Sequence, residues 1–317
     1  MPLSQAIPPC SHGDLPANIA PNSQNSGMEI MRFESPATVE EAVKLLGGES
    51  GMAKVLAGGS DLIVQMKSGR IEPMLIVDIK RIASMGAIQA EAGGFRIGAA
   101  VPCIALEDHK ELKAAWPGVV EAARLIGSTQ VQGRATIAGN LCNGSPAADS
   151  VPALVAASAR VRVVGVKGAR DVDVMNVPTS PGKTSLGKDE IVESIFLPAK
   201  PAKSGDAYLR FIPRTEMDIA VVSAGVFLTL DASGTVTAAR VSLGAVAPTV
   251  LLVAPAAKAL IGSKLDAKAL EALAAAASAA CNPIDDKRGT KDYRIKVAGV
   301  LARRAAEIAY ARAKERK

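Results

Sequence analysis

The regular part of the chain begins with apolar residues at helical spacing in residues 38–46. Thr38 and Glu41 have the spacing of a capping box, in which the first residue caps a helix. The pair Gly47-Gly48 follows, and glycine is typical of a helix end. The sequence therefore predicts an amphipathic helix. Its expected buried face consists of Val39, Ala42, Val43 and Leu46.

The next elements predict a βαβ unit. Residues 53–57 and 74–78 are short apolar runs typical of strands, and residues 61–68 between them suit a helix. The turn Gly58-Gly59 joins the first strand to this helix. Because folds of this kind place ligands at the carboxyl ends of their strands, the turn is a candidate binding loop.

Apolar alternation and turn residues predict a mixture of helices and strands in the rest of the chain. Trp116-Pro117-Gly118 should divide residues 106–126 into two helices. A stretch rich in Pro, Gly and charge at 200–205 is the expected domain boundary. The other expected helices are residues 151–159, 265–280 and 291–314. The expected strands are a hairpin in residues 88–100, residues 161–166 and 191–197, and a second hairpin formed by 219–230 and 236–243.

Composition argues against a membrane-spanning or nucleic-acid-binding protein. Hydrophobic residues make up 49% of the 317 residues, but no apolar run approaches the roughly 20 residues of a transmembrane helix. Aromatic residues make up only 3%, which favours small-residue packing over an aromatic platform for nucleic acid. Much of the net charge of +6 lies in residues 303–317, which fit either a solvated helix end or a docking surface.

The cysteines show no metal-binding spacing. Because none forms a CxxC pair, neither a zinc site nor an iron–sulfur cluster is supported in this chain. Scattered free thiols fit a reducing compartment, and we expect a cytoplasmic protein. Residues 1–27 lack the features of a secretory signal and are expected to be a disordered extension ahead of Met28. The four cysteines are Cys10, Cys103, Cys142 and Cys281.

Acid–base chemistry carried by the protein itself is not indicated. His12 and His109 are the two histidines, and neither lies near a serine or cysteine nucleophile motif. The sequence contains no HExxH or GxSxG motif. If the chain takes part in catalysis, we therefore expect a cofactor to supply the chemistry.

Two segments could together bind one large ligand. Gly58 and Gly59 allow backbone N–H groups to approach a diphosphate closely, and the following helix adds a favourable partial charge. Residues 136–149 are rich in small residues, amides and hydroxyls, and we expect a loop of similar chemistry there. A ligand with both a diphosphate and a polar ring system suits such a pair of loops.

Four segments occur in a fixed order along the chain. They are Val-Leu-Ala-Gly-Gly-Ser-Asp-Leu at 55–62, residues 136–149, Arg-Thr-Glu-Met-Asp-Ile-Ala at 214–220, and Pro-Ile-Asp-Asp-Lys-Arg-Gly at 283–289 with Tyr293-Arg294. Together they resemble the FAD-binding medium subunit of the xanthine dehydrogenase and carbon monoxide dehydrogenase family of molybdenum hydroxylases. The resemblance covers residues 28–317.

The resemblance implies an α+β fold in two domains. An FAD-binding domain of the vanillyl-alcohol-oxidase type, made of two α+β subdomains, is expected at residues 28–202. Its subdomains should lie at about 28–85 and 86–202. A smaller α+β domain of the carbon monoxide dehydrogenase flavoprotein type, with an antiparallel sheet and helices, is expected at residues 206–317.

The resemblance also implies which residues bind FAD. In the first loop these are Leu56, Ala57, Gly58, Gly59, Ser60, Asp61 and Leu62, whose amides should hold the diphosphate. In the second they are Thr136, Gly139, Asn140, Cys142, Ser145 and Asp149. Asp149 is expected to accept hydrogen bonds from the ribose or the flavin side chain, and Cys142 fits either a small buried residue or a redox participant. Weaker matches are Ile126, Ile191 and Val192 beside a ring and Arg210 as a cationic contact. Ala138 stands where the family often has the second glycine of a pair.

The function implied by the resemblance is electron transfer within a three-subunit enzyme. Substrate would be hydroxylated at a molybdenum cofactor on a large subunit, and its electrons would cross [2Fe-2S] clusters on a small subunit. FAD on this chain would pass them to NAD or another acceptor. The alternatives are a free-standing flavin oxidase of the same fold, for which neither histidine lies in a suitable motif, and a non-catalytic scaffold that has lost FAD.

Overall fold

The computed structural model describes residues 31–316. The predicted extension at residues 1–27, with Cys10 and His12, therefore lies outside the described residues. Within the described part of the chain, no helix is both long enough and apolar enough to span a membrane.

A small parallel sheet opens the fold and contains the predicted βαβ unit. Its strand order is β1-β3-β2, and β2 and β3 pair in parallel. The hydroxyl of Thr38 accepts a hydrogen bond from the Glu41 amide at 3.2 Å, and the four residues of the predicted apolar face are those that α1 buries. The elements are β1 (Arg32–Glu34), α1 (Val39–Gly48), β2 (Ala53–Leu56), α2 (Leu62–Lys67) and β3 (Leu75–Asp78).

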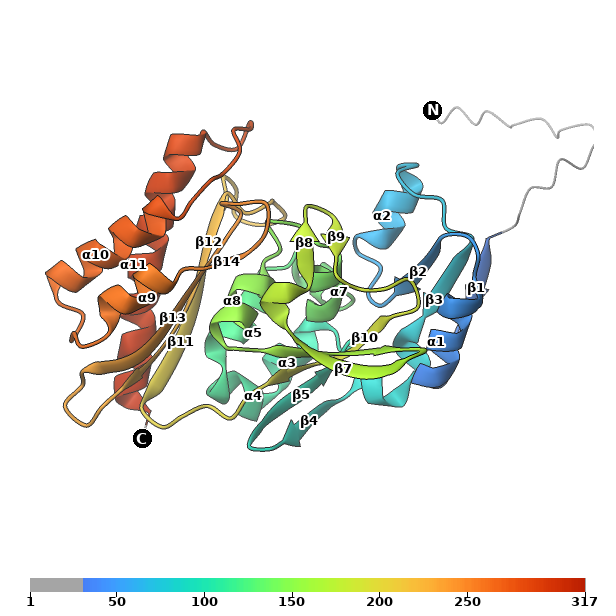
Figure 1. Cartoon of the computed structure of the whole chain (residues 1–317), viewed down its shortest axis with the longest axis horizontal. Coiled ribbons are helices and arrows are strands. Elements are labelled where there is room, and N and C mark those ends of the chain that lie inside the picture. The colour runs from blue at the N-terminus through green and yellow to red at the C-terminus, as the bar shows by residue number, and fades with distance from the viewer. Residues whose placement is uncertain (1–30, 317) are drawn as a thin grey trace, which may run out of the picture. The chain divides into compact units, whose positions relative to one another are not determined.

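A second, antiparallel sheet follows, with helices packed beside it. Its strand order is β4-β5-β10-β6-β7, and the predicted hairpin of β4 and β5 is one of its edges (Figure 1). Its strands are β4 (Ile88–Glu91), β5 (Gly94–Gly98), β6 (Arg160–Gly165), β7 (Gly168–Asp173) and β10 (Ile191–Leu197). The helices between β5 and β6 are α3 (Cys103–Asp108), α4 (Lys110–Ala115), α5 (Pro117–Arg124), α6 (Thr129–Gln132), α7 (Ile137–Cys142) and α8 (Ser150–Ala156). Short elements are η1 (Ile79–Arg81), η2 (Ala83–Gly86), η3 (Val174–Asn176), β8 (Pro178–Ser180) and β9 (Lys183–Thr184).

Two of the sequence-based expectations are wrong in this region. Residues 106–126 take part in three helices, because the His109 ring accepts a hydrogen bond from the Leu112 amide at 3.2 Å and so caps an additional helix. Residues 136–149 are not a continuous loop, because they contain α7. The Thr136 hydroxyl caps this helix by accepting a hydrogen bond from the Gly139 amide at 2.9 Å.

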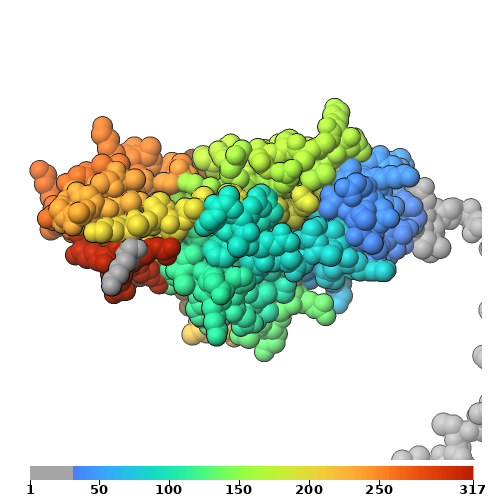
Figure 2. Space-filling view, turned by 90° about the horizontal axis from the view of Figure 1, so that it is seen from below, coloured from blue at the N-terminus to red at the C-terminus, as the bar shows by residue number. Residues whose placement is uncertain are grey.

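The third sheet is antiparallel and lies between two sets of helices. Its strand order is β11-β12-β13-β14, and the predicted hairpin is β12 and β13. Helices α9 and α11 contact its strands on one side, while α5 and α8 contact them on the other (Figure 1). Figure 2 shows the yellow strand residues packed against the red C-terminal helix. The elements are β11 (Ser204–Phe211), β12 (Val222–Leu230), β13 (Val236–Gly244), β14 (Leu251–Leu252), α9 (Ala254–Leu260), α10 (Ala267–Ala279) and α11 (Lys291–Glu315).

Polar contacts join the third sheet and its last helix to the preceding helices. The carboxyl of Asp206 accepts a hydrogen bond from the Gly118 amide at 2.8 Å and pairs with Lys200. Arg312 on α11 pairs with Glu121 on α5 and donates to the Asp206 carbonyl oxygen at 2.8 Å. At Arg312, the basic end of the chain is therefore engaged in tertiary contacts rather than fully solvated.

A buried ion pair makes a further connection. Arg210 on β11 and Asp149, the residue before α8, approach to 2.9 Å, and the Arg210 side chain is only 4% exposed. The Tyr208 hydroxyl lies 3.5 Å from the other carboxylate oxygen of Asp149. Burial raises the pKa of the Asp149 carboxyl to about 6, although Arg210 acts in the opposite direction.

Gly205 provides a test of the packing between β11 and α11. A methyl group at this position would lie 2.0 Å from the carbonyl oxygen of Ala309, so the strand and the helix would have to separate. We expect Gly205→Ala to lower the free energy of unfolding by about 3 kcal/mol in urea titrations. Gly48→Ala is the control, because a methyl group there meets no atom within 4 Å. An equal effect of both substitutions would contradict the proposed close contact.

The raised pKa of Asp149 predicts a specific dependence of stability on pH. An acid with a higher pKa in the folded state stabilises the fold fully below its unfolded pKa, and this contribution is lost as pH rises through the folded value. We expect the stability of the unsubstituted chain relative to Asp149→Asn to fall between about pH 4 and 6, by at most about 3 kcal/mol. Urea titrations of both chains across this window measure it. A relative stability that rises with pH would mean that attraction by Arg210 outweighs burial.

Candidate functional site

The first glycine loop is held in place by a close backbone contact. It runs from the end of β2 to the start of α2, and Gly59 within it has a φ of +75°, which favours glycine. A methyl group at Gly58 would lie 2.0 Å from the carbonyl oxygen of Arg134 and 2.9 Å from the Ala135 Cα. At Gly58 the first loop therefore contacts the backbone of Arg134 and Ala135, which directly precede the second segment.

The first loop presents free hydrogen-bond donors. Among the described residues, no acceptor is paired with the backbone N–H groups of Gly59, Ser60 and Asp61. Consecutive unpaired amides before a helix suit an anion such as a diphosphate. A ligand of this kind would satisfy donors that the chain itself leaves open.

The second segment is built around α7 rather than around a flexible loop. Thr136 caps its start, and the side-chain oxygen of Asn140 accepts hydrogen bonds from the amide and hydroxyl of Ser150 at 3.0 and 2.7 Å. These bonds tie α7 to the beginning of α8. Ala138 is a buried residue of α7, so no positive φ is needed at the position where the family often has glycine.

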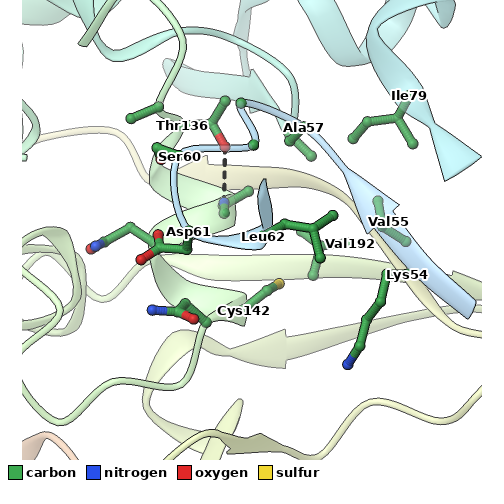
Figure 3. Close-up of a pocket in the computed structure, with 18 of the residues that line it drawn as sticks. Lys54, Val55, Ala57, Ser60, Asp61, Leu62, Ile79, Thr136, Cys142 and Val192 are labelled. Atoms are coloured by element: carbon green, nitrogen blue, oxygen red, sulfur yellow. Dashed lines mark hydrogen bonds between the residues drawn. The ribbon is translucent and has the colours of Figure 1, made fainter. Parts of the chain in front are cut away.

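The two segments line one cleft with a volume of about 220 Å³. Figure 3 shows Ser60 of the first segment, Thr136 of the second and Val192 of β10 among the residues that line this site. The strand β10 changes register between Val192 and Ser194, a bulge at the edge of the cleft. The sequence-predicted residues that line the cleft are Ala57, Gly58, Gly59, Ser60, Asp61, Leu62, Ile126, Thr136, Gly139, Asn140, Cys142, Ile191 and Val192.

Four predicted site residues lie outside the lining of this cleft. Leu56 is the last residue of β2, and the hydroxyl of Ser145 accepts a hydrogen bond from the Ala147 amide at 3.2 Å. Asp149 and Arg210, expected to contact the ligand separately, form the buried ion pair with each other.

Several residues that line the cleft are not among the FAD contacts implied by the resemblance, although Val55 and Asn143 belong to the two segments that carry it. Glu190 lies directly before the predicted Ile191, and Gln65 lies one helical turn after Asp61. Their closeness to predicted site residues was the only sign in the sequence that they could line the cleft. Arg170 holds Glu190 through two hydrogen bonds of 2.8 Å and lowers the pKa of its carboxyl. The additional lining residues are Lys54, Val55, Gln65, Ile79, Ala99, Ala135, Ala138, Asn143, Leu186 and Glu190.

The thiol of Cys142 is poorly suited to redox chemistry. It lines the cleft, but burial raises its pKa to about 12, so the reactive thiolate is scarce at neutral pH. This placement favours the small buried residue over the redox participant. Among residues 31–316, no group of three or more His, Cys, Asp or Glu residues could hold a metal ion.

Two family models together match most of the chain. Residues 28–200 match the FAD-binding domain in molybdopterin dehydrogenase, and residues 207–309 match the carbon monoxide dehydrogenase flavoprotein C-terminal domain. The predicted α+β fold class, with its FAD-binding and C-terminal parts, is confirmed.

Curated proteins and solved structures agree with these matches. The carbon monoxide dehydrogenase medium chain of Afipia carboxidovorans is 35% identical, over 89% of this chain and 97% of its own length. The xanthine dehydrogenase FAD-binding subunit of Escherichia coli O157:H7 is 29% identical, over 90% and 98%. A structure of carbon monoxide dehydrogenase from Hydrogenophaga pseudoflava, lacking the Mo-pyranopterin moiety of its cofactor, contains a chain with 35% identity and a TM-score of 0.85, covering 89% of this chain and 98% of that one. The chain therefore belongs to the family of FAD-binding medium subunits of molybdenum hydroxylases of the xanthine dehydrogenase and carbon monoxide dehydrogenase type, as its sequence motifs predicted.

Proposed function

We propose that this chain binds FAD in the cleft between its two glycine-containing segments and transfers electrons within a molybdenum hydroxylase complex. The observation that carries the proposal is that residues 57–61 and α7, distant in sequence, line the same cleft. When bound, FAD accepts electrons singly and releases them in pairs, which no side chain can do. The chain's own task is to bind, orient and shield this cofactor.

The residues present fit FAD. The unpaired amides of Gly59, Ser60 and Asp61 would hold its diphosphate, because they are donors without acceptors in the chain. The apolar side chains of Ile126 and Val192 offer a surface for a flavin ring and keep water from it. The predicted roles of Asp149 and Arg210 remain proposals that require their ion pair to face the ligand or to open.

The other redox centres would lie on partner subunits. The described residues contain no candidate metal cluster, and the similar proteins are named as medium chains or FAD-binding subunits. We propose a small subunit with [2Fe-2S] clusters as electron donor and a large subunit with the molybdenum cofactor as the place of substrate oxidation. NAD or another acceptor would then remove the electrons.

The domain boundaries and the compartment are parts of the same proposal. Two hydrophobic clusters, one drawn mainly from residues 39–197 and one from residues 207–313, support an FAD-binding domain at 28–202 and a C-terminal domain at 206–317. The thiols of Cys103, Cys142 and Cys281 are free, which supports a reducing compartment such as the cytoplasm.

The alternative functions have weaker support. A free-standing oxidase needs an acid–base group at the flavin, but His109 caps α4 and does not line the cleft. A scaffold without FAD has no use for the open donors that face the cleft. The geometry therefore favours a flavin-carrying subunit.

Gly58→Ala tests the proposed cofactor site. The new methyl group would push the first loop away from the Arg134 carbonyl oxygen, so we expect FAD affinity to fall about ten-fold or more. The measurement is flavin absorbance of the purified chain after reconstitution with FAD and removal of the excess.

Gly86→Ala is the matched control, because a methyl group there meets no atom within 4 Å and its φ is not positive. Thermal unfolding of both variants checks that they are folded. If the unsubstituted chain takes up no FAD, the proposed function is wrong. If Gly58→Ala binds FAD like the control, the site is misplaced.

A further inference from the structure

Helix α2 has weak packing for an element that borders the cleft. It buries none of its six residues, and Ile63 and Val64 are 45% and 63% exposed. So short a helix is unstable on its own and needs contacts with the rest of the fold. Yet its first residue, Leu62, lines the cleft, and the open amides of the first loop directly precede it. The position of α2 therefore decides where those amides point.

One side-chain hydrogen bond ties α2 to a distant segment. The amide nitrogen of Gln65 donates to the side-chain oxygen of Asn143 at 2.9 Å, across 78 positions of the sequence. Among residues 31–316, α2 makes no other side-chain hydrogen bond to a distant segment. Both residues are half-buried and line the cleft, so the bond spans it from the first segment to the second.

The position of Asn143 is fixed by the helix to which it belongs. It is the residue at the end of α7, and its own amide donates to the Gly139 carbonyl oxygen at 2.9 Å. Helix α7 is in turn capped by Thr136 and tied to Ser150 through Asn140. Of the two partners, α2 is therefore the less well packed, and the second segment is the better anchored.

We propose that Gln65 and Asn143 are a positioning pair that holds α2 across the cleft and sets how slowly the chain releases FAD. The inference rests on the proposed function. When the bond breaks, α2 loses its tie to Asn143, and the amides of residues 59–61, between α2 and the fixed Gly58, lose their orientation toward the cleft. A ligand held by these amides then escapes sooner. Because α2 buries no side chain, the loss affects retention of the ligand more than folding.

A double-mutant cycle with Gln65→Met and Asn143→Ala tests the pair. Methionine keeps the length and helix propensity of glutamine but cannot donate the hydrogen bond. We expect each single substitution to raise the FAD dissociation rate about five-fold, the size of one hydrogen bond's net contribution. The double variant should release FAD no faster than either single variant, since both remove the same bond. The recovery of flavin fluorescence after dilution of the loaded chain measures the rate.

The control and the outcomes separate this inference from the proposed function. Val64→Met places the same residue on the exposed side of α2 and should leave the rate unchanged. The urea midpoint of the FAD-free chain should be the same in all variants. If the unsubstituted chain retains no FAD, the proposed function and this inference both fail. If it retains FAD but Gln65→Met releases it at the unsubstituted rate, or if the single effects add, the positioning pair alone is refuted.

Discussion

The cleft depends on one contact between two stretches of backbone. At Gly58 the first loop approaches the Arg134 carbonyl oxygen so closely that no side chain fits between them. The stretch it touches is itself fixed, because the Ala135 carbonyl oxygen accepts a hydrogen bond from the Cys103 amide at 2.8 Å. The parallel sheet that carries the first loop and the helices that carry the second segment are thereby brought to one place. Any side chain at position 58 would force these two stretches apart.

The charges around the cleft are arranged to favour an anionic ligand. Glu190 is neutralised by Arg170, and Asp149, just outside the lining, is paired with Arg210. These two carboxylates are therefore engaged, while the amides of Gly59 and Ser60 stay open. The carboxyl of Asp61 lines the cleft without an ion pair to any described residue, and burial raises its pKa, which disfavours its charged form. Burial raises the pKa of the Cys142 thiol to about 12, so this side chain contributes no negative charge at neutral pH. The surroundings and the loop thus favour the same kind of ligand.

The features that sequence could predict are those whose cause is local. The apolar face of α1, the βαβ unit and the Gly58-Gly59 turn each follow from residue spacing within a few turns of chain. The capping of α4 by His109 was missed because histidine is an uncommon cap, and α7 was missed because Gly139 and Asn140 have low helix propensity. The Asp149–Arg210 pair and the Gln65–Asn143 bond join residues 61 and 78 positions apart, so only tertiary packing reveals them.

The two halves of the cleft achieve close backbone approach by different means. The first half is a turn with a positive φ at Gly59, which a side chain would strain. The second half is a capped helix, in which Ala138 lies without a positive φ and is buried at the wall of the cleft. A glycine at position 138 would add only freedom to the unfolded chain, so alanine there should stabilise the helix without closing the cleft. The departure from the family pattern at Ala138 is therefore compatible with the same site, whereas Gly58 and Gly59 have no such substitute.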